Sequence, residues 1–413
     1  MHICVFGAGI AGLAAAYELQ REGHEITVVD QAAPGSGASA GNGAQLSYSY
    51  VQPLADPSLW RQLPRLLLAA DSPLKLRPRL DPAQWAWGLR FLAACQAHRS
   101  RRTTALLLQL AAESREGFEQ MLRAERLDCD FSTTGKLVLY RDAAALAAAR
   151  RQVALQQALG SRQEVVTAER CLEIEPALGH SAHAIAGAVH TPSECAADCR
   201  MVCAGLAQVL RQRGARFELG ARIGGLVRDG RRIAAARTDR GDLEADAFVV
   251  SLGHASAALA RAQGLPLPVY PLKGYSITLA LEPAQADAAP RVSITDSARK
   301  VVFARLGTRL RVAGMAELGG DERAIPAARI DSLRAATQAL FPQCGHPADV
   351  QPWAGLRPAT PTGLPVTGRL AGAPGNLLFH TGHGALGFTL AFGTARRLVR
   401  LLDGAPAPGL RPA

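Results

Sequence analysis

The residues with the clearest chemical use are three closely spaced glycines and the carboxylate that follows them. Gly7, Gly9 and Gly12 have the spacing G-x-G-x-x-G between an apolar run and an alanine-rich stretch. In that context the first glycine permits a tight turn, the second lets a pyrophosphate approach the backbone, and the third allows close packing of a helix on a strand. Asp30 follows about 20 residues later, where an acid accepts hydrogen bonds from a ribose. The pattern predicts a bound dinucleotide whose phosphates meet a helix N-terminus.

A strand–helix–strand unit is needed to position these residues, and the sequence predicts one. His2–Phe6 is an apolar strand, and the residues after Gly9 are good helix formers up to Gly23. Ile26–Val29 has the uninterrupted apolar character of a buried parallel strand. This unit alone does not distinguish NAD from FAD. The loop Gly35–Gly43, too poor in apolar side chains for regular structure, comes next.

Later segments predict a second body of structure inserted into the first. It is expected to contain two helices and two antiparallel strands, at 104–127, 143–159, 269–281 and 301–316. The first pattern resumes later, where Asp198 is expected to cap a helix that runs to Arg213. Residues 376–402 are predicted to form a strand, a glycine-rich turn and a helix.

Five segments carry a resemblance to a known family. They are the loop 36–47 (SGASAGNGAQLS) and the later segments 271–276 (PLKGYS), 313–317 (AGMAE), 353–368 (WAGLRPATPTGLPVTG) and 381–389 (TGHGALGFT). In these motifs and in their order the chain resembles the D-amino-acid dehydrogenase family. That family belongs to a larger group of flavin amine oxidoreductases, which includes glycine oxidase and sarcosine oxidase. The resemblance covers nearly the whole chain.

The resemblance implies FAD, held noncovalently, and an α/β fold. We expect a Rossmann-type FAD-binding domain over 1–80, 187–260 and 350–413. An interleaved α+β substrate domain with an antiparallel sheet is expected over 81–186 and 261–349. The residues expected to contact FAD are Phe6, Gly7, Ala8, Gly9, Ile10, Ala11, Gly12, Asp30, Gln31, Ser39, Asn42, Gly43, Ala44, Gln45, Leu46, Ile223, Ser251, Gly253, Gly384, Leu386, Gly387 and Thr389.

Four residues are predicted to form the catalytic site. Arg357 matches the carboxylate-binding arginine of the family, and a guanidinium suits a carboxylate because it bonds both oxygens at once. Tyr50 and Tyr275 are candidates to line the pocket and to bond the substrate carboxylate or amine. His383 precedes the last helix, where we expect it to face either the substrate or the flavin edge. A role as general base is the less favoured alternative, because hydride transfer from a neutral amine needs no side-chain base.

The C-terminal motif is expected to act on the flavin through a helix end. A helix beginning near Gly387 would direct its N-terminus at the flavin C2 carbonyl, with the N–H groups of Leu386 and Gly387 and the Thr389 hydroxyl as donors. Two positions depart from the family: Thr362 stands where it commonly has Asp, and Phe388 where it has Trp. Both are expected close to the flavin, so they bear on substrate choice.

The implied reaction is oxidative deamination of a D-amino acid. Hydride transfer from the α-carbon to flavin N5 would give an imino acid, then a 2-oxo acid and ammonia, or a cyclic imine from a proline-like substrate. Electrons would pass to a respiratory acceptor, a quinone or another carrier. The alternatives are an oxygen-using oxidase of glycine, sarcosine or another secondary amine, and a flavoprotein that serves as a binding subunit.

A small or cyclic substrate, D-proline or hydroxy-D-proline, is the leading hypothesis. Tyr50, Tyr275 and Phe388 are expected to form aromatic walls around the α-carbon. We expect no acidic residue of the motifs to pair with a cationic side chain, and Thr362 removes one such partner.

Composition and charge exclude some other functions. The net charge of +11 is spread along the chain without a nucleic-acid motif, so no nucleic-acid partner is expected. Cys195, Cys199 and Cys203 are one turn apart in a segment that looks helical, and no metal is expected. We see no membrane-spanning stretch and no signal peptide and expect a cytoplasmic protein. Trp60–Phe91, with its Trp and Arg residues, is expected to form either ordinary helices of the substrate domain, which is the favoured interpretation, or a peripheral contact with the inner face of the membrane.

Overall fold

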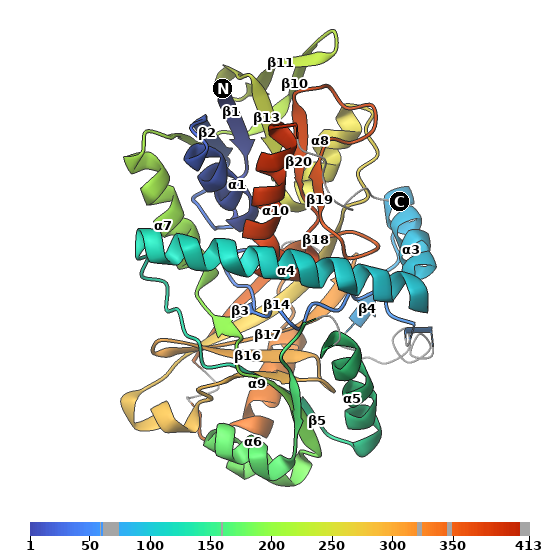
Figure 1. Ribbon diagram of the computed structural model, residues 1–413, viewed down its shortest axis with the longest axis vertical. Helices are drawn as coiled ribbons and strands as arrows, with labels where there is room; N and C mark the ends of the chain where they lie inside the picture. The colour runs from blue at the N-terminus through green and yellow to red at the C-terminus, as the bar shows by residue number, and fades with distance from the viewer. Residues whose placement is uncertain (58, 61–73, 158–159, 320–323, 345–348, 405–413) are drawn as a thin grey trace.

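The strands of the protein form two large sheets that lie one above the other along the long axis (Figure 1). The computed structural model describes residues 1–57, 59–60, 74–157, 160–319, 324–344 and 349–404. Within these residues a six-stranded sheet, the parallel sheet, and a nine-stranded sheet, the mixed sheet, are accompanied by a three-stranded sheet and a two-stranded pair.

The parallel sheet contains the predicted βαβ unit at its centre. Its order is β19 (Val366–Gly368), β20 (Leu377–Thr381), β13 (Ala247–Val250), β1 (His2–Phe6), β2 (Glu25–Asp30) and β9 (Arg216–Leu219). β19 alone among these six runs antiparallel to its neighbour. The central strands are buried on both faces, as their continuous apolar sequences predict.

Helices cover one face of the parallel sheet and a small sheet covers the other. α1 (Ile10–Arg21) packs against α7 (Cys199–Gln212) and α10 (Gly387–Leu402), and α10 also packs against the long α4 (Ala97–Glu125). Apolar residues of these helices and of β1 share one buried cluster. The small sheet, β10 (Ile223–Asp229), β11 (Arg232–Thr238) and β12 (Gly241–Glu244), buries its apolar side against the opposite face.

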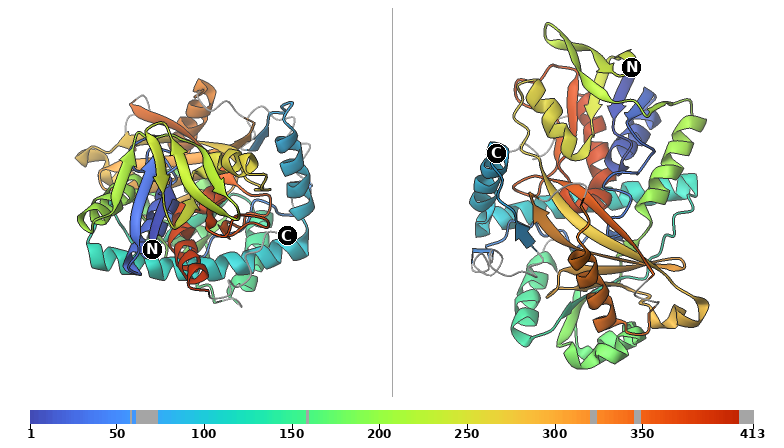
Figure 2. Two further views of the ribbon diagram at one scale, coloured as in Figure 1. Left: turned by 90° about the horizontal axis from the view of Figure 1, so that it is seen from above. Right: turned by 180° about the vertical axis from the view of Figure 1, so that it is seen from behind.

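The mixed sheet is built largely from the second half of the chain. Its order is β18 (Val350–Ala359), β14 (Tyr270–Ala280), β17 (Arg309–Leu318), β16 (Val301–Leu306), β15 (Ser293–Asp296), β5 (Lys136–Tyr140), β7 (Gly187–Thr191) and β6 (Glu164–Val166), with β4 (Leu74–Leu76) beside β17. α9 (Ala327–Leu340) packs on β14 and β17, and Figure 2 shows it from behind.

The remaining elements connect these layers. They are the strand pair β3 (Gln45–Leu46) and β8 (Cys195–Ala196), helices α3 (Pro82–Ala94), α5 (Ala143–Gln157), α6 (Ala168–Ile174) and α8 (Ser256–Ala262), and the 3₁₀ helices η1 (Pro176–Ala184), η2 (Gly253–Ala255), η3 (Pro283–Ala288) and η4 (Gly384–Leu386). The predicted helices and strands are present, although residues 158–159 of the helix predicted at 143–159 lie outside the described residues. Cys195, however, lies in a strand, and the described residues contain no group of His, Cys, Asp and Glu arranged to hold a metal.

The fold class is as predicted, and three strands of the predicted FAD-binding segments pair within the mixed sheet. β4, β7 and β18 were predicted within the FAD-binding segments 1–80, 187–260 and 350–413. Their hydrogen bonds place all three in the mixed sheet, with β17, β5 and β14 as partners. The reason is that sequence position gives no information about which sheet a short strand joins, because pairing is decided over long range.

Candidate functional site

The turn between β1 and α1 has the shape that the glycine spacing requires. Gly7 has a φ of +105°, and a Cβ there would lie 2.4 Å from the carbonyl oxygen of Ser251. A Cβ on Gly12 would lie 1.8 Å from the carbonyl oxygen of Gly7. Gly9 differs, because a Cβ there would approach only the hydroxyl of Ser39 among the described residues, at 3.5 Å. The space over Gly9 is therefore open, as a diphosphate cradle needs.

The charge at this turn also suits an anionic group. α1 has no side-chain cap and no acid in its first turn, and the N–H of Ile10 donates to the Ser39 hydroxyl at 3.1 Å. Asp30 accepts from the N–H groups of Ala8 (2.7 Å) and Ala32 (2.9 Å), one on each carboxylate oxygen. Each oxygen keeps a second lone pair for a ribose hydroxyl. The residues thus fit a dinucleotide, and the Asp30–ribose contact remains a prediction.

Other predicted cofactor residues lie near this edge of the parallel sheet. The N–H of Ser251, just after β13, donates to the carbonyl of Phe6 at 2.8 Å, and Gly253 follows in η2. Gln31 is exposed directly after β2. Ile223 begins β10 and is partly buried against the cluster of the small sheet.

The loop after β2 is held by its own side chains and by the mixed sheet. The Asn42 carboxamide oxygen accepts from the N–H of Ala44 at 2.9 Å, and Ala44 has a φ of +59°. The Gln45 amide nitrogen donates to the carbonyls of Ile294 and Phe303, both at 3.0 Å. The side chains of Asn42 and Gln45 therefore hold the loop in place. The backbone of the loop is the part that remains able to face a cofactor.

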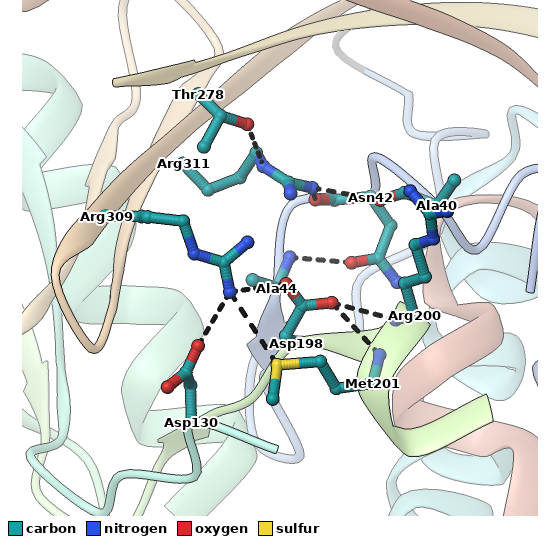
Figure 3. A network of polar contacts seen from close by, with 10 residues as sticks. All are labelled: Ala40, Asn42, Ala44, Asp130, Asp198, Arg200, Met201, Thr278, Arg309 and Arg311. Atoms are coloured by element: carbon teal, nitrogen blue, oxygen red, sulfur yellow. Dashed lines mark hydrogen bonds and ion pairs between the residues drawn. The ribbon is translucent and has the colours of Figure 1, made fainter. Parts of the chain in front are cut away.

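An arginine that the sequence analysis did not identify supports the same loop (Figure 3). Arg311 is 6% exposed, and it donates to the carbonyls of Asn42 (3.1 Å) and Ala40 (3.4 Å) and to the hydroxyl of Thr278 (2.8 Å). Burial lowers its pKa, and it has no ion pair with any described residue. The sequence held one signal for Arg311, because it alternates with apolar residues along a strand. Side chains at alternate positions of a strand point to the same face of the sheet.

Arg309, two residues earlier, ties this region to α7. Its guanidinium bonds Asp130 at 2.7 Å and Asp198 at 3.0 Å, as Figure 3 shows. Asp198 also caps α7 by accepting from the N–H of Arg200 at 2.9 Å, which confirms the predicted cap. The loop, the mixed sheet and α7 are thus joined by one polar network.

Arg357 is a partly buried cation on β18. Its Nη1 donates to the carbonyl of Met315 at 2.8 Å, and no described carboxylate lies within ion-pair distance. A Cβ on Gly274 would lie 2.2 Å from Nη2, so this glycine of the neighbouring strand makes room for the guanidinium. Desolvation lowers the pKa of Arg357 to about 10. A partly buried guanidinium with spare donors suits a carboxylate ligand.

Tyr275 lies on the neighbouring strand with its hydroxyl turned to an acid. The hydroxyl donates to Glu317 at 3.0 Å, and both side chains are 1% exposed. Glu317 also pairs with Arg77 and, at 3.5 Å, with Arg329. Glu317 is an acid within the motif 313–317, contrary to expectation, but two arginines already match its charge. A contact of Tyr275 with substrate remains a prediction.

The end of the loop meets the first turn of α10, and Tyr50 follows three residues later. The Thr389 hydroxyl accepts from the N–H of Ser47 at 3.4 Å, which brings the loop motif and the C-terminal motif together. The ring of Tyr50 faces the ammonium of Lys136, 4.4 Å from the ring centre, and burial raises the pKa of Tyr50. The N–H of Leu386 is already bonded to the carbonyl of His383 at 3.0 Å, so Gly387 and Thr389 are the better placed predicted donors.

His383 lies among packed groups at the start of α10. Its Nε2 is 2.9 Å from the Thr394 hydroxyl, which also contacts His380 at 2.7 Å. Burial lowers the pKa of His383 to about 4, so the ring is neutral at neutral pH. A neutral ring that is bonded to Thr394 gives no support to the hypothesis that His383 acts as a general base. Contact of His383 with the substrate remains a prediction.

The two departures from the family pattern lie in different settings. Phe388 is buried and packs edge-on against Phe118 of α4, with ring centres 5.7 Å apart. This position between helices does not support the predicted aromatic wall. The Thr362 hydroxyl accepts from the N–H of Leu364 at 3.3 Å, within a turn.

The nucleotide turn and the interleaved sheets fit an FAD-dependent oxidoreductase, and comparison with known proteins shows that class. Residues 2–401 match the family described as FAD dependent oxidoreductase, and the chain belongs to that family. Both the predicted cofactor and the predicted family resemblance are thereby confirmed.

Its relatives and structural neighbours extend over nearly the full chain. It is 48% identical to D-amino acid dehydrogenase 2 of Ralstonia nicotianae (97% of this chain, 96% of the relative) and 44% identical to D-amino acid dehydrogenase 2 of Pseudomonas aeruginosa (98% and 95%). Glycine oxidase of Geobacillus kaustophilus has a similar fold, with a TM-score of 0.77 at 20% identity (98% and 95%). L-proline dehydrogenase of P. horikoshii gives 0.75 at 17% identity (98% and 95%).

Proposed function

We propose that this protein is an FAD-dependent D-amino-acid dehydrogenase. The observation that carries the proposal is the partly buried Arg357, whose guanidinium has no acidic partner among the described residues and therefore suits a carboxylate ligand. The names of the two bacterial relatives supply the class of amino acid. Purified protein with an artificial dye acceptor and a panel of D- and L-amino acids tests it. Preference for any L-form would overturn it.

In this proposal the residues of the chain bind and orient the substrate. Arg357 holds the carboxylate through the donors that Met315 leaves unused. Bound FAD supplies the hydride acceptor for the α-hydrogen. The amine must be neutral, and the ring of His383 adds no positive charge because its pKa is lowered to about 4. The released imino acid hydrolyses to a 2-oxo acid and ammonia, or remains a cyclic imine.

A respiratory acceptor and a peripheral membrane contact are further parts of the proposal. No helix among the described residues is long and apolar enough to span a membrane. Exposed apolar side chains gather on and near α3, where Leu80, Trp85 and Leu89 are at least half exposed. Residues 61–73 of the stretch 60–91 lie outside the described residues. Release by high salt in cell fractionation would support a peripheral contact, whereas release only by detergent would contradict it.

For the substrate side chain we propose D-proline or hydroxy-D-proline. Of the three predicted walls, Tyr50 is the one whose position near Ser47 and Thr389 supports this idea. Comparison of kcat/KM for D-proline, hydroxy-D-proline, D-alanine and D-arginine tests it. A preference for D-arginine would overturn the argument.

The alternative is an oxidase of glycine, sarcosine or another secondary amine. It is favoured by the fold shared with glycine oxidase, although that likeness concerns the fold alone. Hydrogen peroxide formed in stoichiometric amounts under air, with no need for a dye, would establish the alternative.

A further inference from the structure

Lys136 is a buried cation that the proposed reaction does not use. It begins β5, is 2% exposed, and donates through Nζ to the Ser47 hydroxyl at 2.8 Å. The same nitrogen lies over the ring of Tyr50. No described carboxylate is within ion-pair distance of it, and burial lowers its pKa to about 8. The ammonium form therefore predominates at neutral pH, in a place where a charge is expensive to keep.

The strand explains why this lysine points away from the core of the mixed sheet. Leu137 and Leu139 lie in the buried cluster of that sheet, so Lys136 and Tyr140 face the other side, as strand alternation requires. There Tyr140 packs in the small cluster that also contains Tyr50. Lys136 thus reaches the end of the cofactor loop from the opposite sheet.

The nearest acid serves the backbone rather than the lysine. Glu194, 1% exposed, accepts from the N–H groups of Tyr48 (2.6 Å) and Ser49 (2.7 Å). Burial raises the pKa of Glu194, although the charge of Lys136 works in the other direction. Glu194 therefore fixes the segment on which Ser47 and Tyr50 lie. Its two oxygens are already bonded there.

The side chains of Lys136 and Ser47 form a wall beside the cofactor loop, and counting their hydrogen-bond donors and acceptors shows which groups this wall can bind. The ammonium of Lys136 has three N–H donors, of which Ser47 takes one. Because Ser47 accepts that bond, its own O–H is left to donate. The backbone N–H of Ser47 bonds Thr389 at the start of α10, which places the wall beside the C-terminal motif. The wall is rich in donors and positively charged.

We propose that Lys136, together with Ser47, selects D-amino acids whose side chain carries a hydrogen-bond-accepting oxygen and rejects cationic side chains. The inference rests on the proposed function, because it places the side chain of the bound amino acid against this wall. The proposal predicts a preference for hydroxy-D-proline over D-proline. It also predicts a preference for D-serine over D-2-aminobutyrate, which is nearly the same size as D-serine. It also gives a reason for excluding D-arginine, since like charges repel.

Matched substrate pairs and three variants test this proposal. The wild-type enzyme should favour the oxygen-bearing member of each pair by on the order of 10-fold in kcat/KM. Lys136→Met should bring that ratio close to one and should improve D-arginine relative to D-alanine. Lys136→Arg, which keeps the charge, should retain the preference, and Ser47→Ala should weaken it. A merely structural role would lower activity without changing these ratios.

A binding measurement separates this proposal from the proposed function. 3-Hydroxypropionate carries a hydroxyl where butyrate carries a methyl group, and neither acid has an amine to oxidise. Calorimetry should show that the hydroxy acid binds more tightly to the wild-type protein than to Lys136→Met. Wild-type ratios in a Lys136→Met protein with full FAD content would overturn the proposal. If that variant does not fold, an unchanged ratio in Ser47→Ala would do so. A wild-type enzyme inactive on all D-amino acids would refute the proposed function, while the acid pair would still test Lys136.

Discussion

The turn after β1 and the cations Arg357 and Lys136 of the mixed sheet suit ligands in opposite ways. At the turn, Gly7, Gly9 and Gly12 leave side chains out, and the groups left to face a ligand are backbone N–H groups of one short segment. Arg357 and Lys136 are long side chains on different strands of the mixed sheet, and they carry charge without acidic partners within ion-pair distance among the described residues. The first arrangement is local and the second depends on long-range packing.

The largest effect should come from filling the turn. In Gly12→Ala the new Cβ would meet the backbone oxygen of Gly7 at 1.8 Å, and backbone atoms cannot move away cheaply. We expect the protein to lose bound FAD and to melt at a clearly lower temperature even without it.

Gly9→Ala is the matched control for this change. Its Cβ would meet only the Ser39 hydroxyl, at 3.5 Å among the described residues, so the apoprotein should melt as wild type does. FAD affinity should still fall, because the added methyl group occupies the space predicted for the diphosphate. Equal melting temperatures for the two apoproteins would contradict this difference between the glycines.

This contrast also explains what the sequence could predict. The turn was predictable because its residues lie within one short segment and each acts through backbone geometry. Arg357 was predictable only through the family resemblance. Arg311, Lys136 and Glu194 were missed, since their partners Asn42, Ser47 and Tyr48 are roughly 90 or more positions distant and no local pattern identifies these partners. The sheet that β4, β7 and β18 join could not be predicted for the same reason.

Removing the Arg357 guanidinium should affect the substrate and spare the cofactor. Arg357→Met should lower kcat/KM for D-amino acids by roughly 10- to 150-fold, which corresponds to about 1.5–3 kcal/mol for a charge-assisted contact. FAD content should stay at the wild-type level, as absorbance will show. The melting temperature should hold or rise slightly, because a partly buried charge without an acidic partner among the described residues is removed. Unchanged kinetics would place the carboxylate anchor elsewhere.

A smaller change is expected where the mixed sheet supports the cofactor loop. Arg311→Met removes the donors to the carbonyls of Ala40 and Asn42, so the loop should hold FAD less firmly. We expect its Kd for FAD to rise on the order of 10-fold, with part of the lost bonding offset by removal of a buried charge. Flavin fluorescence in titrations of apoprotein measures this.

Arg311→Lys is the matched variant, since it keeps the charge but has no planar fork to reach two carbonyls. It should resemble the Met variant in FAD affinity. Full wild-type affinity in both variants would show that the loop holds its position without this arginine.

The smallest effect should distinguish the two tyrosines predicted to line the pocket. Tyr275 gives its hydroxyl to Glu317, which keeps Arg77 and Arg329 as partners when that bond is lost. Tyr275→Phe should therefore reduce the free energy of unfolding by about 1 kcal/mol and leave kcat/KM unchanged. Tyr50→Phe removes the hydroxyl from the ring that faces Lys136, so a changed KM is expected there with little change in stability. Denaturant unfolding and steady-state kinetics on both variants make the comparison. If Tyr275→Phe raises KM as strongly as Tyr50→Phe, its hydroxyl turns to the substrate in the working enzyme, and the contact with Glu317 belongs to the ligand-free protein alone.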